Sequence, residues 1–435
     1  MPATSRSRPL DGGAFFSSET KGTLNLGNTN FAGHSGSFDI NLGNDTSGLE
    51  IDATGIRVEG VAVADMSTSE LFDVEDRIAH KLDESPHALG FVQVKENQVY
   101  VTRNSGSIQR GINAADSGDV VNVQSGIYNE NLTIDKALTL DGEGADTTKL
   151  ASSNAGKGTG ITISASNVTV QNLGISGYQN GAFLTGTIEN VTFANLAFAN
   201  NRYGVTFNKP DAKVDGFTMR DSTITGGTIG VSQDTNLGAD NTPTSLLTNA
   251  LFERVQISGA SFQGMHFEAA DNLVLTDVTV TDSGNVGYED QDYNYGHGID
   301  INLKFADYSS ITFNNVVVEN SGYSSGRSTG AAVVIKTRGG PGDSSSYTKR
   351  PATLQALNIN GGRIEGSQGQ GLRIEDLSNG EGGQPTVRID GMRFADNGMD
   401  IVVAGKTNVD ATGATFEGAA DGFAIEDRVY HALDQ

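Results

Sequence analysis

The feature that most constrains the fold is a short repeat in which apolar and polar residues alternate on both sides of an Asn or Asp. The repeat occupies Val168–Gly177, Val191–Asn201, Phe217–Gly227, Leu273–Gly284, Ile311–Gly322 and Val387–Gly398. Alternation of period two predicts strands with one buried face. Asn and Asp tolerate the left-handed conformation that a bend between two strands requires. We therefore expect a stacked corner formed by Asn172, Asn195, Asp221, Asp277, Asn315 and Asp390.

A further strand starts at a glycine in each repeat. These glycines are Gly160, Gly181, Gly204, Gly230, Gly264, Gly298, Gly330, Gly371 and Gly398. A chain of 435 residues with 56 glycines, 8 prolines and no cysteine suits an elongated stack better than a single globular core. The pattern predicts an all-β fold, a right-handed single-stranded parallel β-helix with short capping helices.

A second, larger duplication suggests how the chain is organised. IDATGIRVEG at Ile51–Gly60 matches VDATGATFEG at Val409–Gly418, and VEDRIAHKLD at Val74–Asp83 matches IEDRVYHALD at Ile425–Asp434. The EDR segments have the apolar spacing of short amphipathic helices, and the duplication predicts a module of a tandem array. We expect a flexible tail (1–13), a β-rich segment ending in a helix (14–83), a cap (84–125), the solenoid (126–418) and a C-terminal helix (419–435).

Charge narrows the range of partners. The chain has 29 Lys and Arg against 53 Asp and Glu, a net charge of −24. Such a surface repels nucleic acid and anionic membranes, and it suits either Ca²⁺ binding or simple solubility. No stretch is apolar for long enough to span a membrane, and Met1–Gly13 lacks the apolar core of a signal peptide. We expect an extracellular or cell-surface protein that uses another export route.

The outward face of the glycine-initiated strands carries the candidate site. Odd positions after each glycine are apolar and belong to the core, so even positions face outward. Neighbouring coils lie about 4.8 Å apart, which places these side chains in one strip. Loops 235–249, 339–352 and 377–385 follow these strands and loops 285–297 and 321–329 precede them, as walls of a cleft. The strip contains Asn208, Asp234, His266, Glu268, Asp300, Asn302, Lys304, Lys336, Arg338, Arg373 and Glu375.

The loop that precedes Gly298 adds further candidates. Tyr293, Tyr295 and His297 are aromatic or acid-base groups suited to a sugar, and an acidic run offers Ca²⁺ ligands at Glu289, Asp290 and Asp292. Solvation of a polar face is the simpler explanation of any such strip. His80 and His431 recur in the two EDR segments, where packing against a cap explains them without catalysis.

Two resemblances agree with this reading. GIYNENLTIDKALTLDGEG at Gly126–Gly144 resembles the opening coils of pectin methylesterases and other right-handed β-helix proteins, which implies the fold. The segments that begin GMHFEAADN at Gly264 and HGIDINLKF at His297 resemble the catalytic coils of mannuronan C5-epimerase modules and β-helix alginate lyases. The Asp-Pro-His motif of those epimerases is absent, although Met265-His266-Phe267-Glu268 keeps the histidine.

The function that these features favour is proton removal at C5 of a uronate in an extended acidic polysaccharide, by a lyase or a C5-epimerase. The reaction needs cations, a base and an acid. Lys304, Arg338 and Arg373 suit the first role, His266 or Lys336 the second, and Tyr295 or His297 the third. Two alternatives remain open. One is a non-catalytic glycan-binding or structural repeat, and the other is hydrolysis by carboxylates among Asp234, Glu268, Asp300 and Glu375.

Overall fold

The computed structural model describes residues 12–17, 19–33, 37–43, 45–207, 211–285, 296–322, 330–340, 342–375, 377, 386–405, 407–418 and 423–426. The chain divides into two compact units. Unit 1 comprises Met1–Glu130, Ala137–Lys149 and Gln171–Leu173, and unit 2 comprises Asn131–Lys136, Leu150–Val170 and Gly174–Gln435.

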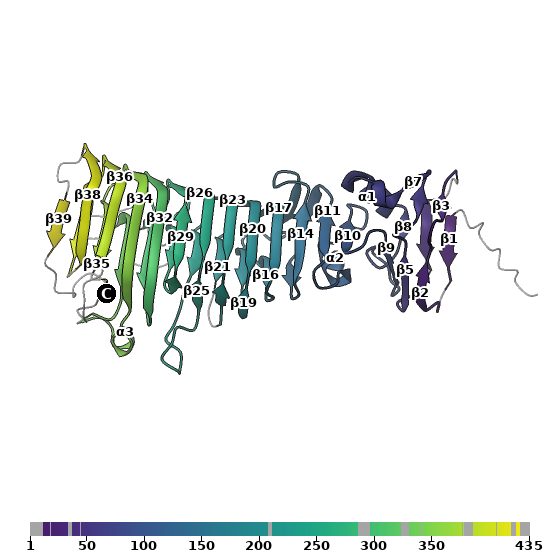
Figure 1. The fold of residues 1–435 in the computed structure, drawn as a ribbon, viewed down its shortest axis with the longest axis horizontal. Helices are drawn as coiled ribbons and strands as arrows, with labels where there is room; N and C mark the ends of the chain where they lie inside the picture. The colour runs from purple at the N-terminus through teal and green to yellow at the C-terminus, as the bar shows by residue number, and fades with distance from the viewer. Residues whose placement is uncertain are drawn as a thin grey trace, which may run out of the picture. The chain divides into compact units, whose positions relative to one another are not determined.

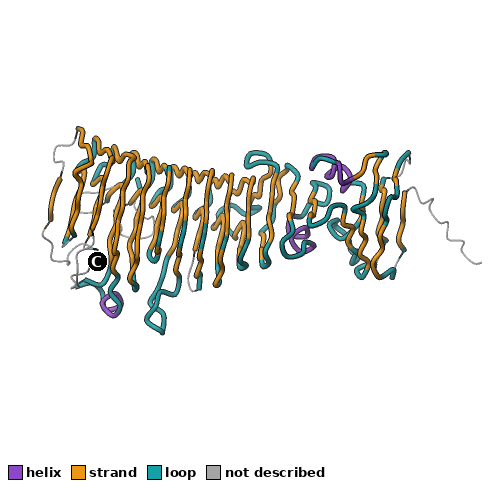
Figure 2. Tube along the Cα trace, in the orientation of Figure 1, coloured by secondary structure: helices purple, strands orange, loops and turns teal. Residues whose placement is uncertain are grey.

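Unit 2 is a parallel β-helix, as predicted, in which successive coils add one strand to each sheet (Figures 1 and 2). The predicted glycine-initiated strands all lie in its 11-stranded sheet, hereafter the site sheet. In order it contains β13 (Leu132–Ile134), β16 (Thr159–Ile163), β18 (Asn180–Leu184), β21 (Tyr203–Phe207), β24 (Ile229–Gln233), β27 (Gln263–Phe267), β31 (His297–Leu303), β33 (Ala331–Thr337), β35 (Gln370–Glu375), β37 (Met399–Ala404) and β39 (Phe423–Glu426).

Two other parallel sheets complete the coils of unit 2. The longer one contains β17 (Val168–Ser176), β20 (Val191–Ala199), β23 (Thr218–Thr225), β26 (Leu251–Ser258), β29 (Leu273–Thr276), β30 (Thr279–Thr281), β32 (Asp307–Glu319), β34 (Thr353–Glu365), β36 (Thr386–Ala395) and β38 (Asn408–Glu417). The shorter one contains β19 (Thr187–Glu189), β22 (Lys213–Asp215), β25 (Leu246–Thr248) and β28 (Ala270–Asp271). The described residues of unit 2 contain one helix, α3 (Ser345–Lys349), in the loop between β33 and β34.

The core of unit 2 is a set of apolar columns, and the inward positions predicted from the glycines are buried. Val231, Met265, Ile299 and Val333 pair in register on successive strands, and each is fully buried. Gly264 shows why a glycine starts such a strand. A Cβ there would lie 2.5 Å from the carbonyl oxygen of Gly298 and 2.6 Å from Val280. Each filled rung contributes about 1.5–3 kcal/mol of apolar burial.

The predicted corner exists, with one correction. The backbone φ angles of Asn172, Asn195, Asp221, Asp277 and Asn315 lie between 51° and 59°. Asp390 is not a corner residue, because it pairs with Asn360 one position before the bend, and the left-handed residue there is Gly391. The prediction placed Asp390 by counting from the Asn/Asp of the repeat, whereas β36 bends at the following glycine.

Unit 1 is also β-rich, as predicted for its first part. Its strands are β1 (Gly12–Phe16), β2 (Gly22–Asn25), β3 (Asn30–Phe31), β4 (Phe38–Leu42), β5 (Leu49–Asp52), β6 (Arg57–Val58), β7 (Val61–Ala62), β8 (Ile78–Ala79), β9 (Phe91–Gln93), β10 (Gln98–Val101), β11 (Val120–Val123), β12 (Gly126–Tyr128) and β14 (Leu138–Gly142), and β15 (Thr148–Ala151) begins in it. Its helices are η1 (Val63–Asp65), α1 (Thr68–Glu75) and α2 (Ile108–Ala114). The predicted helix over 107–115 is confirmed by α2.

The first predicted EDR helix is wrong as placed, and most of the second lies outside the described residues. In the first copy, α1 ends at Glu75 and the EDR segment runs into β8. The helix starts earlier because Ser67 and Glu70 form a capping box. In the second copy, Phe423–Glu426 is the strand β39, and the rest of the segment, including His431, lies outside the described residues.

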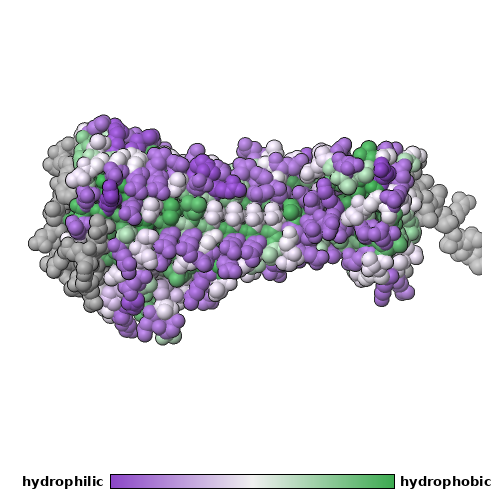
Figure 3. Space-filling view, in the orientation of Figure 1, coloured by the Kyte–Doolittle hydropathy of each residue, from purple (hydrophilic) through white to green (hydrophobic). Residues whose placement is uncertain are grey.

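The surface agrees with the acidic, polar composition. Over the strands of unit 2 that face the viewer in Figure 3, hydrophilic residues predominate and a narrower, less polar band runs along the stack. Among the described residues, no helix is both long and apolar enough to cross a membrane.

Candidate functional site

The register of the site sheet divides the predicted strip in two. One outward ladder pairs Ser232 with His266, His266 with Asp300, Asp300 with Val334, and Val334 with Arg373. The apolar Val334 therefore separates the His266–Asp300 rungs from Arg373. Because coils are about 4.8 Å apart, Arg373 lies two rungs beyond Asp300 rather than beside it.

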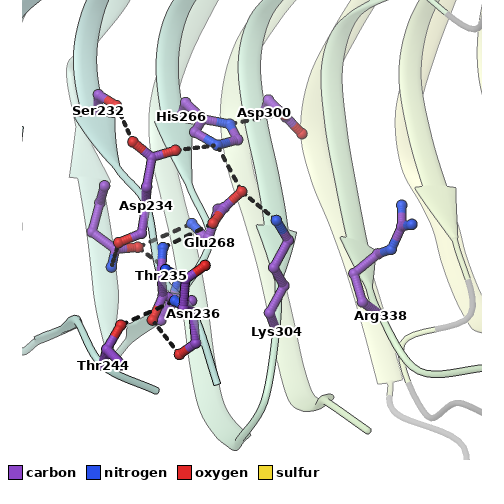
Figure 4. A network of polar contacts seen from close by, with 12 residues as sticks. Ser232, Asp234, Thr235, Asn236, Thr244, His266, Glu268, Asp300, Lys304 and Arg338 are labelled. Atoms are coloured by element: carbon purple, nitrogen blue, oxygen red, sulfur yellow. Dashed lines mark hydrogen bonds and ion pairs between the residues drawn. The ribbon is translucent and has the colours of Figure 1, made fainter. Parts of the chain in front are cut away.

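His266 is the centre of the larger cluster. Its Nδ1 lies 2.9 Å from Asp300 Oδ2, and its Nε2 points toward Asp234 and Glu268 on the other side (Figure 4). Nε2 is 3.4 Å from Glu268 Oε1 and 3.6 Å from Asp234 Oδ1. The imidazole is thus enclosed by three carboxylates, Glu268 from its own coil and Asp234 and Asp300 from the coils on either side.

Lys304 balances part of this negative charge. Its Nζ contacts Glu268 Oε1, while the amide of Thr235 donates to Glu268 Oε2 at 2.8 Å. Ser232 Oγ donates to Asp234 Oδ2 at 3.2 Å. His266, Glu268, Asp300 and Lys304 are each at most 8% exposed. The cluster is therefore a buried ionic network, and removing one partner would leave another charge without compensation.

The carboxylates control the protonation of His266. Burial disfavours its charged form, but the contacts with the carboxylates of Asp234, Asp300 and Glu268 outweigh burial and raise the pKa of His266 well above its ordinary value. Burial also opposes ionisation of Asp300, yet His266 holds the pKa of Asp300 well below its usual range. The pKa of Glu268 is lowered in the same way, against burial, by His266 and Lys304. All three groups are therefore charged in the folded protein near neutral pH.

Two glutamines that the sequence analysis missed hold this cluster in place. Gln263 Nε2 donates to Asp300 Oδ2 at 2.8 Å, from the position immediately before Gly264. Gln233 is fully buried in a core column, where its Oε1 accepts from the amides of Glu268 and Ala269 and its Nε2 donates to Ser245. The sequence did contain a signal for Gln233, because a polar residue stands there at a position that is apolar in the neighbouring strands.

An aromatic residue from the loop after β33 completes the described site. Tyr347 in α3 contacts two cations of the strip, with Lys304 Nζ 5.3 Å and Arg338 Cζ 4.8 Å from its ring centroid. Arg338 also forms an ion pair with Asp343 at 2.8 Å. The sequence analysis assigned this loop to a wall of the cleft but did not single out Tyr347. The contacts connect His266 to Tyr347 through Glu268 and Lys304.

Lys336 differs from the other cations of the strip. It pairs in register with Asn302 and Glu375, but among the described residues it forms no ion pair, whereas Lys304, Arg338 and Arg373 each contact a carboxylate. The Asn302 Oδ1 atom next to it is buried without a hydrogen-bond partner in the described part of the chain. Lys336 and Asn302 are therefore the groups best placed to receive a ligand.

The remaining predicted residues are placed as follows. Arg373 is buried and contacts Glu375 and Gln370, so these residues form a separate cluster. His297 is buried with Nδ1 3.2 Å from the Ala331 carbonyl oxygen, and burial lowers its pKa. The other predicted residues lie outside the described part of the chain: Asn208, Glu289, Asp290, Asp292, Tyr293 and Tyr295.

Asp234, His266 and Glu268 also form a group with metal-ligand chemistry. One atom from each, a carboxylate oxygen or an imidazole nitrogen, lies within 4.8 Å of the other two. The described site thus offers buried carboxylates, an imidazole, a phenol and several cations on neighbouring coils. These groups can transfer protons, bind a carboxylate or coordinate a cation.

Several solved structures resemble this one. An alginate lyase from Paenibacillus sp. str. FPU-7 shares 12% identity (TM-score 0.38), with 75% of this chain and 99% of that chain covered. A mannuronan C-5 epimerase A-module from Azotobacter vinelandii shares 14% identity (TM-score 0.45), with 75% and 92% covered. The pectate lyase Pel9A shares 14% identity (TM-score 0.41), with 73% and 78% covered. The resemblance to epimerase modules and lyases expected from the sequence is confirmed as structural similarity. No protein-family model and no curated protein matches the sequence.

Proposed function

We propose that unit 2 acts on an extended, uronate-containing polysaccharide by removing the proton at C5, as a lyase or a C5-epimerase. Such a reaction needs a cation for the sugar carboxylate and groups that accept and return a proton. Lys336 binds the carboxylate, and Asn302 Oδ1 accepts a hydrogen bond from a sugar hydroxyl. The Tyr347 hydroxyl transfers the proton next to Lys304 and Arg338. The buried His266 network holds this arrangement. A polymer of this kind places the protein outside the cell or on its surface.

The observation that carries the proposal is the position of Lys336. Among the described residues of the strip, it is the cation that no carboxylate has neutralised. Asp300 lies close enough for its pKa to be lowered in part by the Lys336 charge, so Lys336 borders the His266 network. A cation in this setting attracts a carboxylate ligand more strongly than one already paired, because no existing ion pair has to break.

The test is incubation of the full chain with alginate, pectate and glycosaminoglycans while absorbance near 235 nm is followed. A lyase forms an unsaturated product that absorbs there. For an epimerase, incorporation of deuterium from D₂O at C5 is followed by NMR. We expect one of the two signals, and we expect Lys336→Met and Tyr347→Phe each to reduce the rate by about 10²–10⁴-fold.

The matched control is Lys213→Met, which removes the same charge from the exposed strand β22 and is expected to leave the rate unchanged. Absence of both signals with every polymer would refute C5 chemistry. A rate that Lys336→Met leaves intact would refute the placement of the site.

A second candidate, a non-catalytic repeat of a tandem array, is favoured by a different observation. The two copies of the sequence IDATG/VDATG form the same pair of side-chain hydrogen bonds, the first after β5 and the second within β38. Thr54 donates to Asp52 Oδ1 from its amide at 3.0 Å and its hydroxyl at 2.6 Å, and Thr412 donates to Asp410 Oδ1 at 3.1 and 2.8 Å. Neighbouring modules and glycan binding without turnover are then the expected functions. Retained polysaccharide on an affinity gel, without either catalytic signal, would favour this candidate.

A further inference from the structure

We propose that Asp234, His266 and Glu268 form a binding site for one divalent first-row transition metal ion of the Zn²⁺ class. The ligands are Asp234 Oδ1, His266 Nε2 and Glu268 Oε1, and a fourth position stays open to water or a ligand. This inference does not depend on the polysaccharide chemistry proposed above. These three residues are not those of the acidic loop (Glu289, Asp290 and Asp292) in which the sequence analysis expected Ca²⁺.

The distances from His266 Nε2 to the two carboxylates match those between ligands of one metal ion. Nε2 of His266 lies 3.4 Å from Glu268 Oε1 and 3.6 Å from Asp234 Oδ1. Both values exceed a good hydrogen bond, which ends near about 3.2 Å. Two ligands of a tetrahedral Zn²⁺ with bonds of about 2.0–2.1 Å are about 3.3–3.4 Å apart. The nitrogen of this nearly buried side chain is thus directed at both carboxylates, at separations close to those of two ligands on a coordinated ion (Figure 4).

The three ligand side chains are also fixed in position by their neighbours. Each ligand is held by a separate group on its far atom: Ser232 Oγ on Asp234 Oδ2, the Thr235 amide on Glu268 Oε2, and Asp300 on His266 Nδ1. Asp300 is itself fixed by Gln263. Metal-bound histidines commonly donate their other N–H to a carboxylate, which fixes the ring and leaves the second nitrogen for the metal.

Ligand chemistry decides the class of ion. One imidazole and two carboxylates suit Zn²⁺ or Mn²⁺, whereas Ca²⁺ and Mg²⁺ prefer six or more oxygen ligands. The charge agrees with a divalent ion. The metal displaces the Nε2 proton that His266 carries in the metal-free protein. Asp234, Glu268 and Asp300 then carry three negative charges against the one positive charge of Lys304, and a 2+ ion makes the cluster neutral.

Lys304 provides the sharpest test because it competes with the metal. Its Nζ contacts the same Glu268 Oε1 atom that the metal would use. Removing the ammonium group frees that oxygen and removes a repelling charge. Lys304→Met is therefore expected to bind Zn²⁺ several-fold more tightly than the wild type, a gain that a misfolded variant would not show.

The experiment is isothermal titration of metal-stripped full chain with Zn²⁺, with Ca²⁺ as comparison. We expect one site per chain, weakened by about 10–100-fold in His266→Gln and Glu268→Gln. Asp211→Asn, an exposed carboxylate of the same unit, should leave the affinity unchanged. Co²⁺ in place of Zn²⁺ should give the visible absorption of a tetrahedral ion, which His266→Gln removes. Zn²⁺ binding that His266→Gln leaves intact, Ca²⁺ binding of equal strength, or weaker binding by Lys304→Met would each overturn the proposal.

Discussion

Each of the two units buries a histidine against a carboxylate, and the two histidines differ in what the second ring nitrogen does. In unit 1, His80 Nε2 lies 2.5 Å from Glu75 Oε1, and the amide of Val92 donates to Nδ1 at 3.1 Å. The ring also stacks on Phe91, with centroids 5.4 Å apart. In unit 2, His266 Nδ1 is held by Asp300, and Nε2 faces two carboxylates at 3.4 and 3.6 Å.

The comparison shows that burial and a carboxylate partner do not by themselves indicate a functional histidine. His80 joins Glu75 at the end of α1 to the Val92 amide in β9, so the residue serves packing, as expected from the sequence. Asp300 orients the His266 ring, and the Nε2 atom faces two carboxylates at distances longer than a good hydrogen bond. The environment of the second nitrogen, rather than the pairing of the first, distinguishes the two sites.

The largest expected effect is loss of stability in unit 1 when His80 is removed. His80→Ala leaves Glu75 buried without its partner and the Val92 amide without an acceptor, which should lower the free energy of unfolding by about 3–5 kcal/mol. Denaturant unfolding followed by circular dichroism measures this loss. Polysaccharide turnover by the folded fraction should be unchanged. A loss below about 1 kcal/mol would contradict the structural role of His80.

A smaller effect is expected from Asp300→Asn in unit 2. The pKa of His266 should fall toward its ordinary value because one of three carboxylates is lost, and NMR titration of the metal-free protein measures the shift. The raised pKa of His266 stabilises the fold below the ordinary histidine pKa of 6.5, and this contribution is lost as pH rises through the folded value. The lowered pKa of Asp300 stabilises it above 3.8.

The stability difference between wild type and Asp300→Asn should therefore be largest between the ordinary pKa values of the two groups, 3.8 for Asp and 6.5 for His. We expect about 1–3 kcal/mol there, since the variant keeps a polar group of the same shape. Thermal unfolding at several pH values checks the window. A difference that grows steadily as pH rises through the folded pKa of His266 would contradict this assignment of charges.

The smallest effect is expected at an exposed ion pair, which serves as the reference for both buried ones. Arg350 contacts Asp307 at 2.8 Å with both side chains at least 40% exposed. Arg350→Ala should change the free energy of unfolding by less than about 1 kcal/mol, and high salt should remove the difference. A larger loss would mean that ion pairs in this acidic protein contribute more than their burial indicates.

Much of the fold could be predicted because its repeat is local. Alternation around each Asn or Asp and a glycine at each strand start specify the strands, their inward faces and most of one corner. The prediction failed where a neighbouring residue decided the local structure: Gly391 takes the bend expected at Asp390, and the capping box of Ser67 and Glu70 starts α1 before the EDR segment. Apolar spacing alone does not show where a helix starts, and the Ser-x-x-Glu pattern at 67–70 was the signal that would have shown it.

The site was predicted in part. Counting from the glycines placed His266, Glu268, Asp300 and Lys304 on one face, and the structure brings these four together. Counting from the glycines did not place Val334 beside Asp300, because Asp300 is the second residue after Gly298 whereas Val334 is the fourth after Gly330. The count therefore did not show that Val334 separates Arg373 from this cluster. Tyr347 was missed because a short helix inside a loop determines where its ring lies.

The in-register pairing of Ser232, His266 and Asp300 has a consequence for how such a site arises and disappears. The core columns accept any coil with the right apolar residues, so duplication of one coil between β27 and β31 would preserve the fold. The same event would move Asp300 one rung away from His266 and dismantle the network in a single step. In a solenoid of this kind, a site depends on which coils are neighbours as well as on which residues they carry. A lineage can therefore lose or regain a site by a change in the number of coils alone.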